Sequence, residues 1–228
     1  MNVICKVYKP EIMQCPICGS KLVYCYAISN KLVYFTSGKR FRIKNLGYSC
    51  PHCNNNIYFS QTANKLCFKG HSYSAKVFCL IAYFKWLGKS RNEICDYFSQ
   101  KEIDISDRNV DNLYNKFQKL YNDDYQNKID SAIKNMLTKF NEIRFSIDVI
   151  TINKVVFIIL YDFFTGEILA LKKFDTITDP EIENFLKIFI NKENNITIIA
   201  TIRKDAVFVP LLKKLVPAKT KIIAFNKF

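Results

Sequence analysis

The pattern of apolar and polar residues changes along this 228-residue chain, and each change predicts a different kind of structure. Residues 1–70 carry short apolar stretches typical of strands, and residues 71–121 carry apolar residues at helical spacing. Residues 122–140 are charged and contain no Pro or Gly, which predicts a connecting helix. Residues 141–228 alternate between strand-like and helical patterns. The chain is therefore predicted to be an α+β protein of several domains with boundaries at these positions.

The first region predicts a small β structure. Apolar stretches at 22–28 and 31–36 flank Ser29-Asn30, which predicts a hairpin turn at these two residues. The next stretch, 38–44, alternates so that three cations share one strand face, and these are Arg40, Arg42 and Lys44. Three like charges in a row repel one another unless they are solvated or meet phosphate. This face is therefore either a nucleic-acid contact or an ordinary solvated surface.

The second region predicts three helices. The first ends at Gly88, the second begins with Ser90 as its N-cap, and the third begins after Ser106. Apolar residues form one seam of the third helix, and its opposite side carries polar residues that include Arg108, Asn109, Asn112, Asn115 and Lys116. Asn and Arg can read base edges, so the three helices are predicted to form a helix-turn-helix that binds DNA. The alternative is a plain three-helix bundle, which also has a polar outer face.

The last region predicts an α/β domain with a mixed sheet. A helix with Asp179 as its N-cap and a second helix, 205–216, alternate with strands in the order β-β-β-α-β-α-β. Asp148 lies in the first strand, on the face opposite Phe145 and Ile147. The five predicted strands are 143–150, 155–161, 167–171, 196–200 and 221–225.

The distribution of charge indicates a class of partner. The formal net charge is +14, and residues 1–70 contain ten Lys or Arg against one acid, Glu11, which leaves +9 in this region. Positive charge concentrated on a small module is typical of proteins that bind the phosphate backbone of nucleic acid. A general excess of Lys from an AT-rich genome is the alternative. It does not explain why acids are nearly absent from the first 70 residues.

Four of the nine Cys residues form two short pairs, Cys15-Pro-Ile-Cys18 and Cys50-Pro-His-Cys53. Four thiolates from two such C-x-x-C knuckles predict a closed tetrahedral Zn²⁺ site, and hence a zinc ribbon over residues 1–70. The alternatives are a redox C-x-x-C motif, which needs only one pair, or unrelated cysteines.

The remaining features concern location and the other thiols. There is no apolar run of 18 or more residues and no apolar stretch typical of a signal peptide, so neither a membrane span nor export is expected. A cytoplasmic location with reduced or metal-bound thiols follows as an expectation. Cys67 and His71 have a metal-like spacing, but most of the other cysteines are expected to be buried small apolar residues.

In the order of its parts, the chain resembles the DDE transposases of prokaryotic insertion sequences over nearly all of its length. The resemblance begins with the two cysteine knuckles and continues through the helix-turn-helix. It then enters a ribonuclease H-like domain through the strand Phe145-Ser-Ile-Asp-Val149 and the hairpin 160–169. It implies double-stranded DNA as the partner and leaves self-association open. It also implies three carboxylates that hold two divalent metal ions for in-line phosphoryl transfer, with Mg²⁺ suited to oxygen ligands.

By the same resemblance, Asp148 occupies the position of the first carboxylate. The second position is Thr201, which cannot supply an anionic ligand, and Asp205 has the place of a helix N-cap. The third carboxylate belongs on a later helix, which is expected to be missing, and Phe225-Asn226 stands where the family often has Phe-His. The ribonuclease H-like domain is therefore expected to be incomplete.

The sequence thus predicts a truncated or degenerate transposase that binds DNA and has lost catalysis, with Mg²⁺ needed only if it is active. One alternative is an active transposase that uses Asp148, Asp205 and a third acid from Asp162 or another chain. The other is a zinc-ribbon module that binds RNA or protein.

Overall fold

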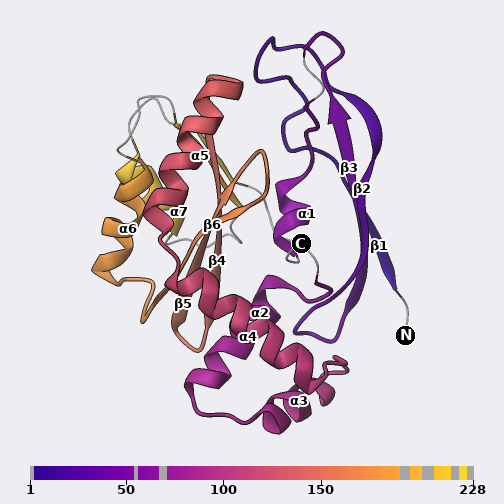
Figure 1. Ribbon diagram of the computed structural model, residues 1–228, viewed down its shortest axis with the longest axis vertical. Coiled ribbons are helices and arrows are strands. Elements are labelled where there is room, and N and C mark those ends of the chain that lie inside the picture. Colours follow the sequence, from indigo (N-terminus) through magenta and orange to yellow (C-terminus); the bar gives the residue numbers. More distant parts are fainter. Residues whose placement is uncertain are drawn as a thin grey trace. The chain divides into compact units, whose positions relative to one another are not determined.

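The computed structural model describes residues 3–53, 56–66, 71–190, 196–201, 208–216 and 221–224. The chain divides into two compact units, residues 1–119 and residues 120–228. Within the described residues, seven helices and two β-sheets form an α+β fold, with one sheet in each unit (Figure 1). The positions of Cys67, Asp205, Phe225 and Asn226 lie outside the described residues.

The sheet of the first unit has three strands, β1 (Ile4–Tyr8), β2 (Val23–Tyr34) and β3 (Arg40–Ser49), in the order β1-β3-β2. The central strand β3 pairs in parallel with β1 and antiparallel with β2. Two bulges, between Tyr24 and Tyr26 and between Ala27 and Ser29, each add one residue to β2. The long curved β2 is visible along the edge of this unit in Figure 1.

The hairpin turn predicted at Ser29-Asn30 is wrong, because β2 runs unbroken through both residues. The chain instead reverses after Phe35, whose backbone N–H donates to Lys39 O (3.1 Å) and whose carbonyl accepts from Gly38 N (2.9 Å). Gly38 has a φ of +76°, in the left-handed region that glycine adopts without a clash from a Cβ. Ser29 and Asn30 pair with Asn45 and Lys44 of β3, and this pairing with a distant segment overrides the local turn preference of Ser-Asn.

One face of this sheet, called the inner face, packs on the short helix α1 (Gln61–Leu66). Val33 and Ile43 are buried on this face against Ala63 of α1. Neither β1 nor α1 was predicted from the sequence. Both are short, and a segment of five or six residues carries too few repeats of either period to be recognised.

The first turn of α1 is held by the one acid of the N-terminal region. The Glu11 carboxylate accepts from Ser60 Oγ (2.6 Å), Gln61 N (3.1 Å) and Thr62 N (2.8 Å). Ser60 also exchanges two hydrogen bonds with the buried Asn45 of β3, at 2.9 and 3.0 Å. Glu11 therefore satisfies N–H groups that would otherwise lack a partner at the start of the helix.

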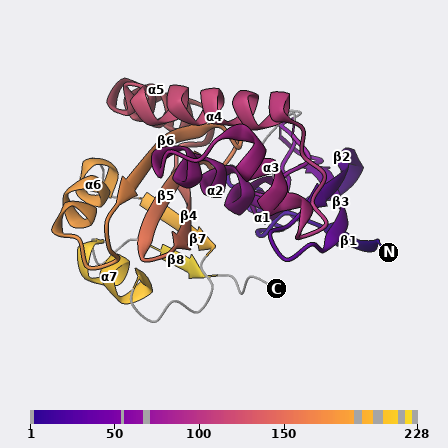
Figure 2. The same cartoon turned by 90° about the horizontal axis from the view of Figure 1, so that it is seen from below.

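Three further helices complete the first unit, α2 (Ala75–Trp86), α3 (Arg91–Ser99) and α4 (Asp107–Asn122). They are grouped in one bundle, as Figure 2 shows. Their apolar faces meet in a core of buried residues that includes Phe78, Ile94, Phe98, Val110 and Phe117.

The predicted ends of these helices are confirmed. Ser90 and Glu93 form a capping box at the start of α3. Gly88 follows α2 with a φ of +76°. Ser106 Oγ accepts from Asn109 N (3.3 Å) at the start of α4.

Backbone hydrogen bonds join the sheet to this bundle within the first unit. Tyr34, the last residue of β2, donates its N–H to Ser72 O (2.8 Å) and accepts from Ser74 N (3.0 Å). Tyr73 lies between Ser72 and Ser74 in the sequence, and its hydroxyl donates to Asp104 O (2.9 Å) in the loop before α4. The end of the hairpin is thus held against the helices.

The second unit is built on a mixed five-stranded sheet in the order β6-β5-β4-β7-β8. The meander β4-β5-β6 is antiparallel, whereas β7 pairs in parallel with β4 and β8 pairs in parallel with β7. The predicted succession of strands and helices is confirmed. The strands are β4 (Ile143–Ile152), β5 (Val155–Asp162), β6 (Ile168–Phe174), β7 (Ile196–Thr201) and β8 (Lys221–Ala224).

Helices α5 (Tyr125–Phe140), α6 (Pro180–Ile190) and α7 (Phe208–Leu215) contribute to one core with this sheet. The strand residues in that core include Phe145 and Ile147, so the helices cover the sheet face on which these residues lie. The segment predicted as a connector, 122–140, mostly forms α5 and is part of this core. None of the described helices is both long and apolar enough to span a membrane.

Two glycines with the same backbone conformation test how firmly the β2–β3 turn is held against the helices. A Cβ at Gly38 would lie 2.6 Å from the backbone O of Lys101, whereas a Cβ at Gly88 would have no atom within 4 Å. We expect Gly88→Ala to lower the free energy of unfolding by about 1–2 kcal/mol, the cost of a left-handed non-glycine residue. Gly38→Ala should cost at least about 1 kcal/mol more, because the Lys101 backbone must also move. Equal losses in urea unfolding would show that the turn is not packed there.

Candidate functional site

The first cysteine knuckle is a tight turn between two short extended segments. Cys15 N donates to Ser20 O (2.8 Å), and Gly19 N donates to Cys15 O (2.9 Å). Gly19 has a φ of +74°, which lets the chain turn back within six residues. Gln14 and Lys21 then pair as an antiparallel bridge. Cys15 is buried and Cys18 is exposed on this turn.

The second knuckle begins where β3 ends. Cys50 follows Ser49, the last residue of β3, and is buried. His52 N donates to Cys50 Sγ (3.4 Å) within this turn. Tyr48 and Tyr58 exchange two backbone hydrogen bonds (2.8 and 2.7 Å), so the chain after the knuckle returns to pair with β3.

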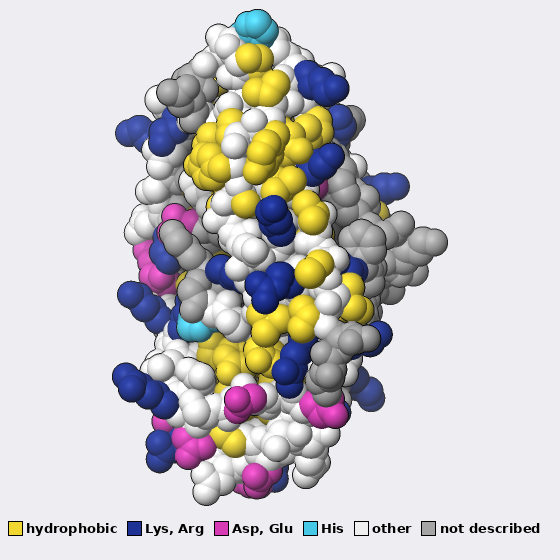
Figure 3. All heavy atoms as spheres, turned by 90° about the vertical axis from the view of Figure 1, so that its right-hand side faces the viewer, with side chains coloured by type: hydrophobic (Ala, Val, Ile, Leu, Met, Phe, Trp, Pro, Cys, Tyr) yellow, Lys and Arg dark blue, Asp and Glu magenta, His cyan; other side chains and the backbone are white. Residues whose placement is uncertain are grey.

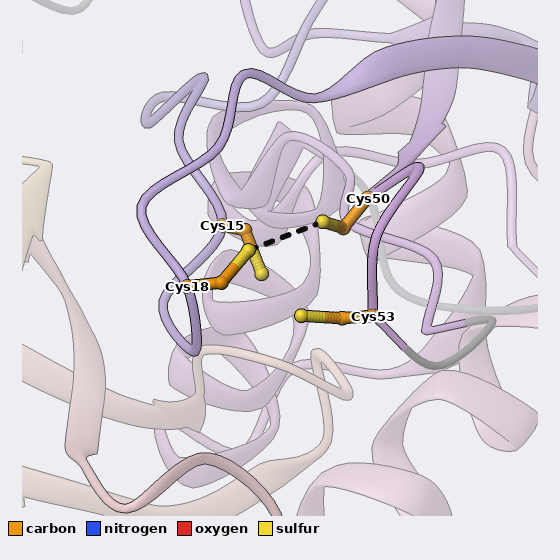
Figure 4. A group of neighbouring side chains, drawn as sticks. All are labelled: Cys15, Cys18, Cys50 and Cys53. Carbon is orange, nitrogen blue, oxygen red and sulfur yellow. Dashed lines mark hydrogen bonds between the residues drawn. The ribbon is translucent and has the colours of Figure 1, made fainter.

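The two knuckles bring four sulfurs together, and Figure 4 shows their side chains converging from opposite segments. The Sγ atoms of Cys15, Cys18, Cys50 and Cys53 lie within 4.8 Å of one another, and those of Cys18 and Cys50 are 3.5 Å apart. Tetrahedral ligation with metal–sulfur bonds near 2.3 Å requires sulfur separations of about 3.8 Å. The four cysteines therefore form a cluster that could bind a single metal ion, and no protein rearrangement beyond side-chain adjustment is needed.

The electrostatics of the cluster favour a cation. Hydrogen bonds from Ser20 and from neighbouring thiols lower the pKa of Cys18 to about 6. Cys18 in turn raises the pKa of Cys53 to about 12, because a second negative charge beside the first is unfavourable. Four adjacent sulfurs can all be ionised only when a positive ion balances them. Four protein ligands fill a tetrahedral shell, so such an ion would be structural rather than catalytic.

Tyr58 lies beside the four cysteines, a position that was not predicted from the sequence. Its hydroxyl lies 4.0 Å from Cys15 Sγ. Burial and the nearby Cys15 raise the pKa of Tyr58, so the hydroxyl stays protonated and can donate toward the sulfur. An aromatic residue five positions after the second knuckle was the available signal, but its pairing with Tyr48 could not be read from the sequence.

The other described cysteines do not join this cluster. Within the described part of the chain, it is the single group of three or more His, Cys, Asp or Glu residues that could hold a metal ion. The expectation that most remaining cysteines are buried is wrong for the described ones. Cys5 and Cys25 are exposed and Cys95 is partly exposed, whereas Cys79 is buried. Cys5 and Cys25 lie on edge strands of a sheet with one open face, a layout that the sequence pattern did not reveal.

The structure places the three predicted cations in one row on β3. Arg42 and Lys44 are exposed and Arg40 is partly exposed, on the face opposite the buried Ile43. The Arg40 guanidinium lies over the Tyr34 ring, 5.2 Å from its centroid. Among the described residues, none of these three cations forms an ion pair.

The five polar residues predicted on the third helix all lie on one side of α4, within an arc of about 120°. Arg108, Asn112 and Asn115 are exposed and follow i, i+4 and i+3 spacing, so they form one stripe. Asn109 borders this stripe, is also exposed and donates to the Tyr73 hydroxyl (3.5 Å). Lys116 is half-buried, and burial together with the nearby Lys31 of β2 lowers its pKa.

Asp148 lies in the middle of β4 and is fully buried. In the register of the sheet it pairs with Ile159 of β5 on one side and with Thr201 of β7 on the other. The position at which the resemblance requires a second carboxylate is thus directly beside Asp148 and is occupied by Thr201.

Asp162, the third acid of the active-enzyme alternative, serves a different purpose. Its Oδ1 accepts from Phe164 N (2.7 Å) and Thr165 N (3.0 Å), which shapes the turn between β5 and β6. Burial raises its pKa. It pairs with Phe145, so its side chain leaves the sheet on the face opposite Asp148. Asp148 and Asp162 therefore cannot share a metal site in this arrangement.

A scan against models of known protein families found no match to this chain, and a search of curated proteins found no relative.

The four-cysteine cluster predicts a metal requirement that can be measured directly. We expect the purified chain to hold about one tightly bound metal ion, and Cys18→Ala to lose it because a tetrahedral site needs all four ligands. Cys25→Ala is the matched control, since Cys25 lies in the same region but outside the cluster. Metal content by elemental analysis and unfolding of the first unit by circular dichroism should change together. A chain that is metal-free under reducing conditions and still fully folded would contradict this expectation.

Proposed function

We propose that this protein is a transposase-derived DNA-binding protein that has lost strand-transfer activity. Its first unit, in this proposal, is a zinc ribbon joined to a helix-turn-helix, and it binds double-stranded DNA. The observation that carries the proposal is the row Arg40, Arg42 and Lys44, exposed or partly exposed cations without ion-pair partners among the described residues. The single acid of residues 1–70, Glu11, is engaged at the start of α1 and does not neutralise them.

Zinc is the metal that best fits the cysteine cluster. Four thiolates in tetrahedral arrangement are soft ligands that favour Zn²⁺ or iron–sulfur chemistry over hard cations such as Mg²⁺. A single ion with four protein ligands and the two C-x-x-C knuckles is the arrangement of structural zinc ribbons. The proposed role of the ion is to hold the ribbon together.

The α4 helix supplies the proposed reading surface. Arg108, Asn112 and Asn115 form an exposed stripe of side chains able to hydrogen-bond base edges. A helix of 16 residues that presents such a stripe is suited to the major groove. Asn109 and Lys116 border that stripe and lie near Tyr73 and Lys31, so in the proposal they contribute to the joint with the sheet.

The second unit supports transposase ancestry more than catalysis. Its antiparallel meander followed by alternating helices and parallel strands is the arrangement expected of a ribonuclease H-like domain. Asp148 lies on the central strand, where the resemblance requires the first carboxylate. Its register neighbours are Ile159 and Thr201, which carry no carboxylate, and Asp162 lies on the opposite face of the sheet.

Duplex binding predicts a specific dependence on salt. Replacing Arg40, Arg42 and Lys44 with Ala should reduce the slope of log affinity against log salt by up to about 2.7, since each lost phosphate contact removes about 0.9. Binding of a fluorescent duplex at several salt concentrations measures this slope. A control variant with Lys134, Lys139 and Lys154 changed to Ala removes the same charge from exposed positions of the second unit. If both variants change the slope equally, the contact does not lie on β3.

Loss of catalysis predicts that the chain neither cleaves nor joins DNA strands with Mg²⁺ or Mn²⁺. The reason is that two metal ions must stabilise both the attacking and the leaving oxygen, and one carboxylate cannot hold them. The assay compares the unmodified chain with Asp148→Asn, which preserves the size of the buried side chain, on supercoiled and linear DNA. Cleavage that Asp148→Asn abolishes would restore the active-transposase alternative. Equal inactivity with intact DNA binding supports the proposal.

A further inference from the structure

The three-stranded sheet of the first unit has one face with exposed side chains, which include Val7, Tyr24, Arg42 and Lys44. Val33 and Ile43 pack on α1 at the inner face, so the residues that alternate with them lie on the other side, here called the outer face. On β3 these are Arg40, Arg42, Lys44, Leu46 and Tyr48. Figure 3 looks onto the side of this sheet and shows hydrophobic side chains gathered there, with Lys and Arg among them.

An exposed aromatic ring lies on the same face as the cations. Tyr24 of β2 pairs with Tyr48 in the register, and the two rings contact edge to face with centroids 5.8 Å apart. Each bulge of β2 reverses the alternation of side chains between the two faces, and two bulges restore it. Leu32, which pairs with Arg42, therefore lies on the outer face as well. Tyr24 is 55% exposed, unusually open for so large a ring in a strand.

The outer face therefore combines three features along one line. Arg40 stacked on Tyr34 marks one end, Arg42 and Lys44 follow, and Tyr24 beside Tyr48 marks the other end. Eight residue steps of β3 separate Arg40 from Tyr48, which corresponds to about 27 Å of extended strand. The neighbouring strand β1 adds apolar surface, because Val7 pairs with Lys44 and is exposed.

We infer that the outer face binds single-stranded DNA, with phosphates along Arg40, Arg42 and Lys44 and a base stacked on Tyr24. Single-strand-binding surfaces combine a positively charged track with exposed aromatic rings, because every unpaired base offers a π-face. The choice of DNA rests on the proposed function. The single strand goes beyond it, since the proposed function needs only a duplex.

Duplex DNA does not account for Tyr24. In a duplex the base faces are stacked on one another and an aromatic ring on a flat sheet cannot reach them, whereas unpaired bases can be splayed onto such rings. A second copy of this chain is disfavoured as the occupant, because it would set two rows of Arg42 and Lys44 against each other with no acid between them. The apolar neighbours Val7 and Leu32 fit sugar and base surfaces beside the phosphate row.

The test uses the full chain loaded with its metal and fluorescently labelled probes of equal length: oligo-dT, a mixed-sequence duplex and oligo-U RNA. We expect Tyr24→Leu to weaken oligo-dT binding at least about fivefold, the lower end for loss of one stacked base. Tyr24→Phe keeps the ring and should bind as the unmodified chain does. Neither variant should change duplex binding. Metal content and thermal unfolding confirm that each variant is folded.

A second variant separates this inference from the proposed function. Arg108→Ala combined with Asn112→Ala should weaken duplex binding and leave oligo-dT binding unchanged. If Tyr24→Leu has no effect on oligo-dT while the α4 variant still weakens duplex binding, the single-strand inference alone is overturned. If oligo-dT binding depends on Tyr24 but no duplex binds, the proposed function fails and the inference stands. Equal losses on duplex and single strand, or tighter Tyr24-dependent binding to oligo-U or to anionic lipid vesicles, would overturn the assignment to single-stranded DNA.

Discussion

The convergence of four thiols is the constraint on which the first unit depends. Cys18 and Cys50 are 32 residues apart, and joining them ties the segment before β2 to the end of β3. The inner face of the sheet packs only a small group of side chains around Val33 and Ile43 against a six-residue helix. Among the described residues this core is small, and a metal ion bound by the four thiols would add a cross-link that stabilises the three strands. The outer face keeps exposed side chains that a ligand could contact.

In the first unit, the charges of the sheet and those of the helices are arranged differently. Both carboxylate oxygens of Glu11, the one acid of residues 1–70, accept hydrogen bonds from the start of α1. The cations of β3 are therefore not neutralised by their own region, and like charges on neighbouring strand positions lower the stability of the sheet. Ion pairs occur instead among the helices, where Asp111 of α4 contacts both Lys85 and Arg91. The helices are balanced by internal pairs, whereas the sheet keeps a charge that an anionic partner could balance.

Sequence patterns predicted the features that depend on local chemistry. The two knuckles, the caps at Ser90 and Ser106 and the meander of the second unit all follow from residue types at fixed spacings. The errors came from features that depend on partners distant in sequence. The Ser29-Asn30 turn is replaced by a strand because β3 pairs across a bulge, and β1 exists because it adds to β3 in parallel. Tyr58 reaches the cysteine cluster only through its pairing with Tyr48.

The second unit separates the residues that hold its fold from those that could carry chemistry. Its core lies on the sheet face with Phe145 and Ile147, where α5, α6 and α7 pack. Asp148 and the register position of Thr201 lie on the other face. The face of Asp148 is buried as well, because Phe157 and Ile159 on that face are fully buried. In the proposed ancestry, a recognisable sheet persists after its metal site is gone because burial on both faces holds the strands, whereas a Thr in place of a carboxylate removes only a metal ligand.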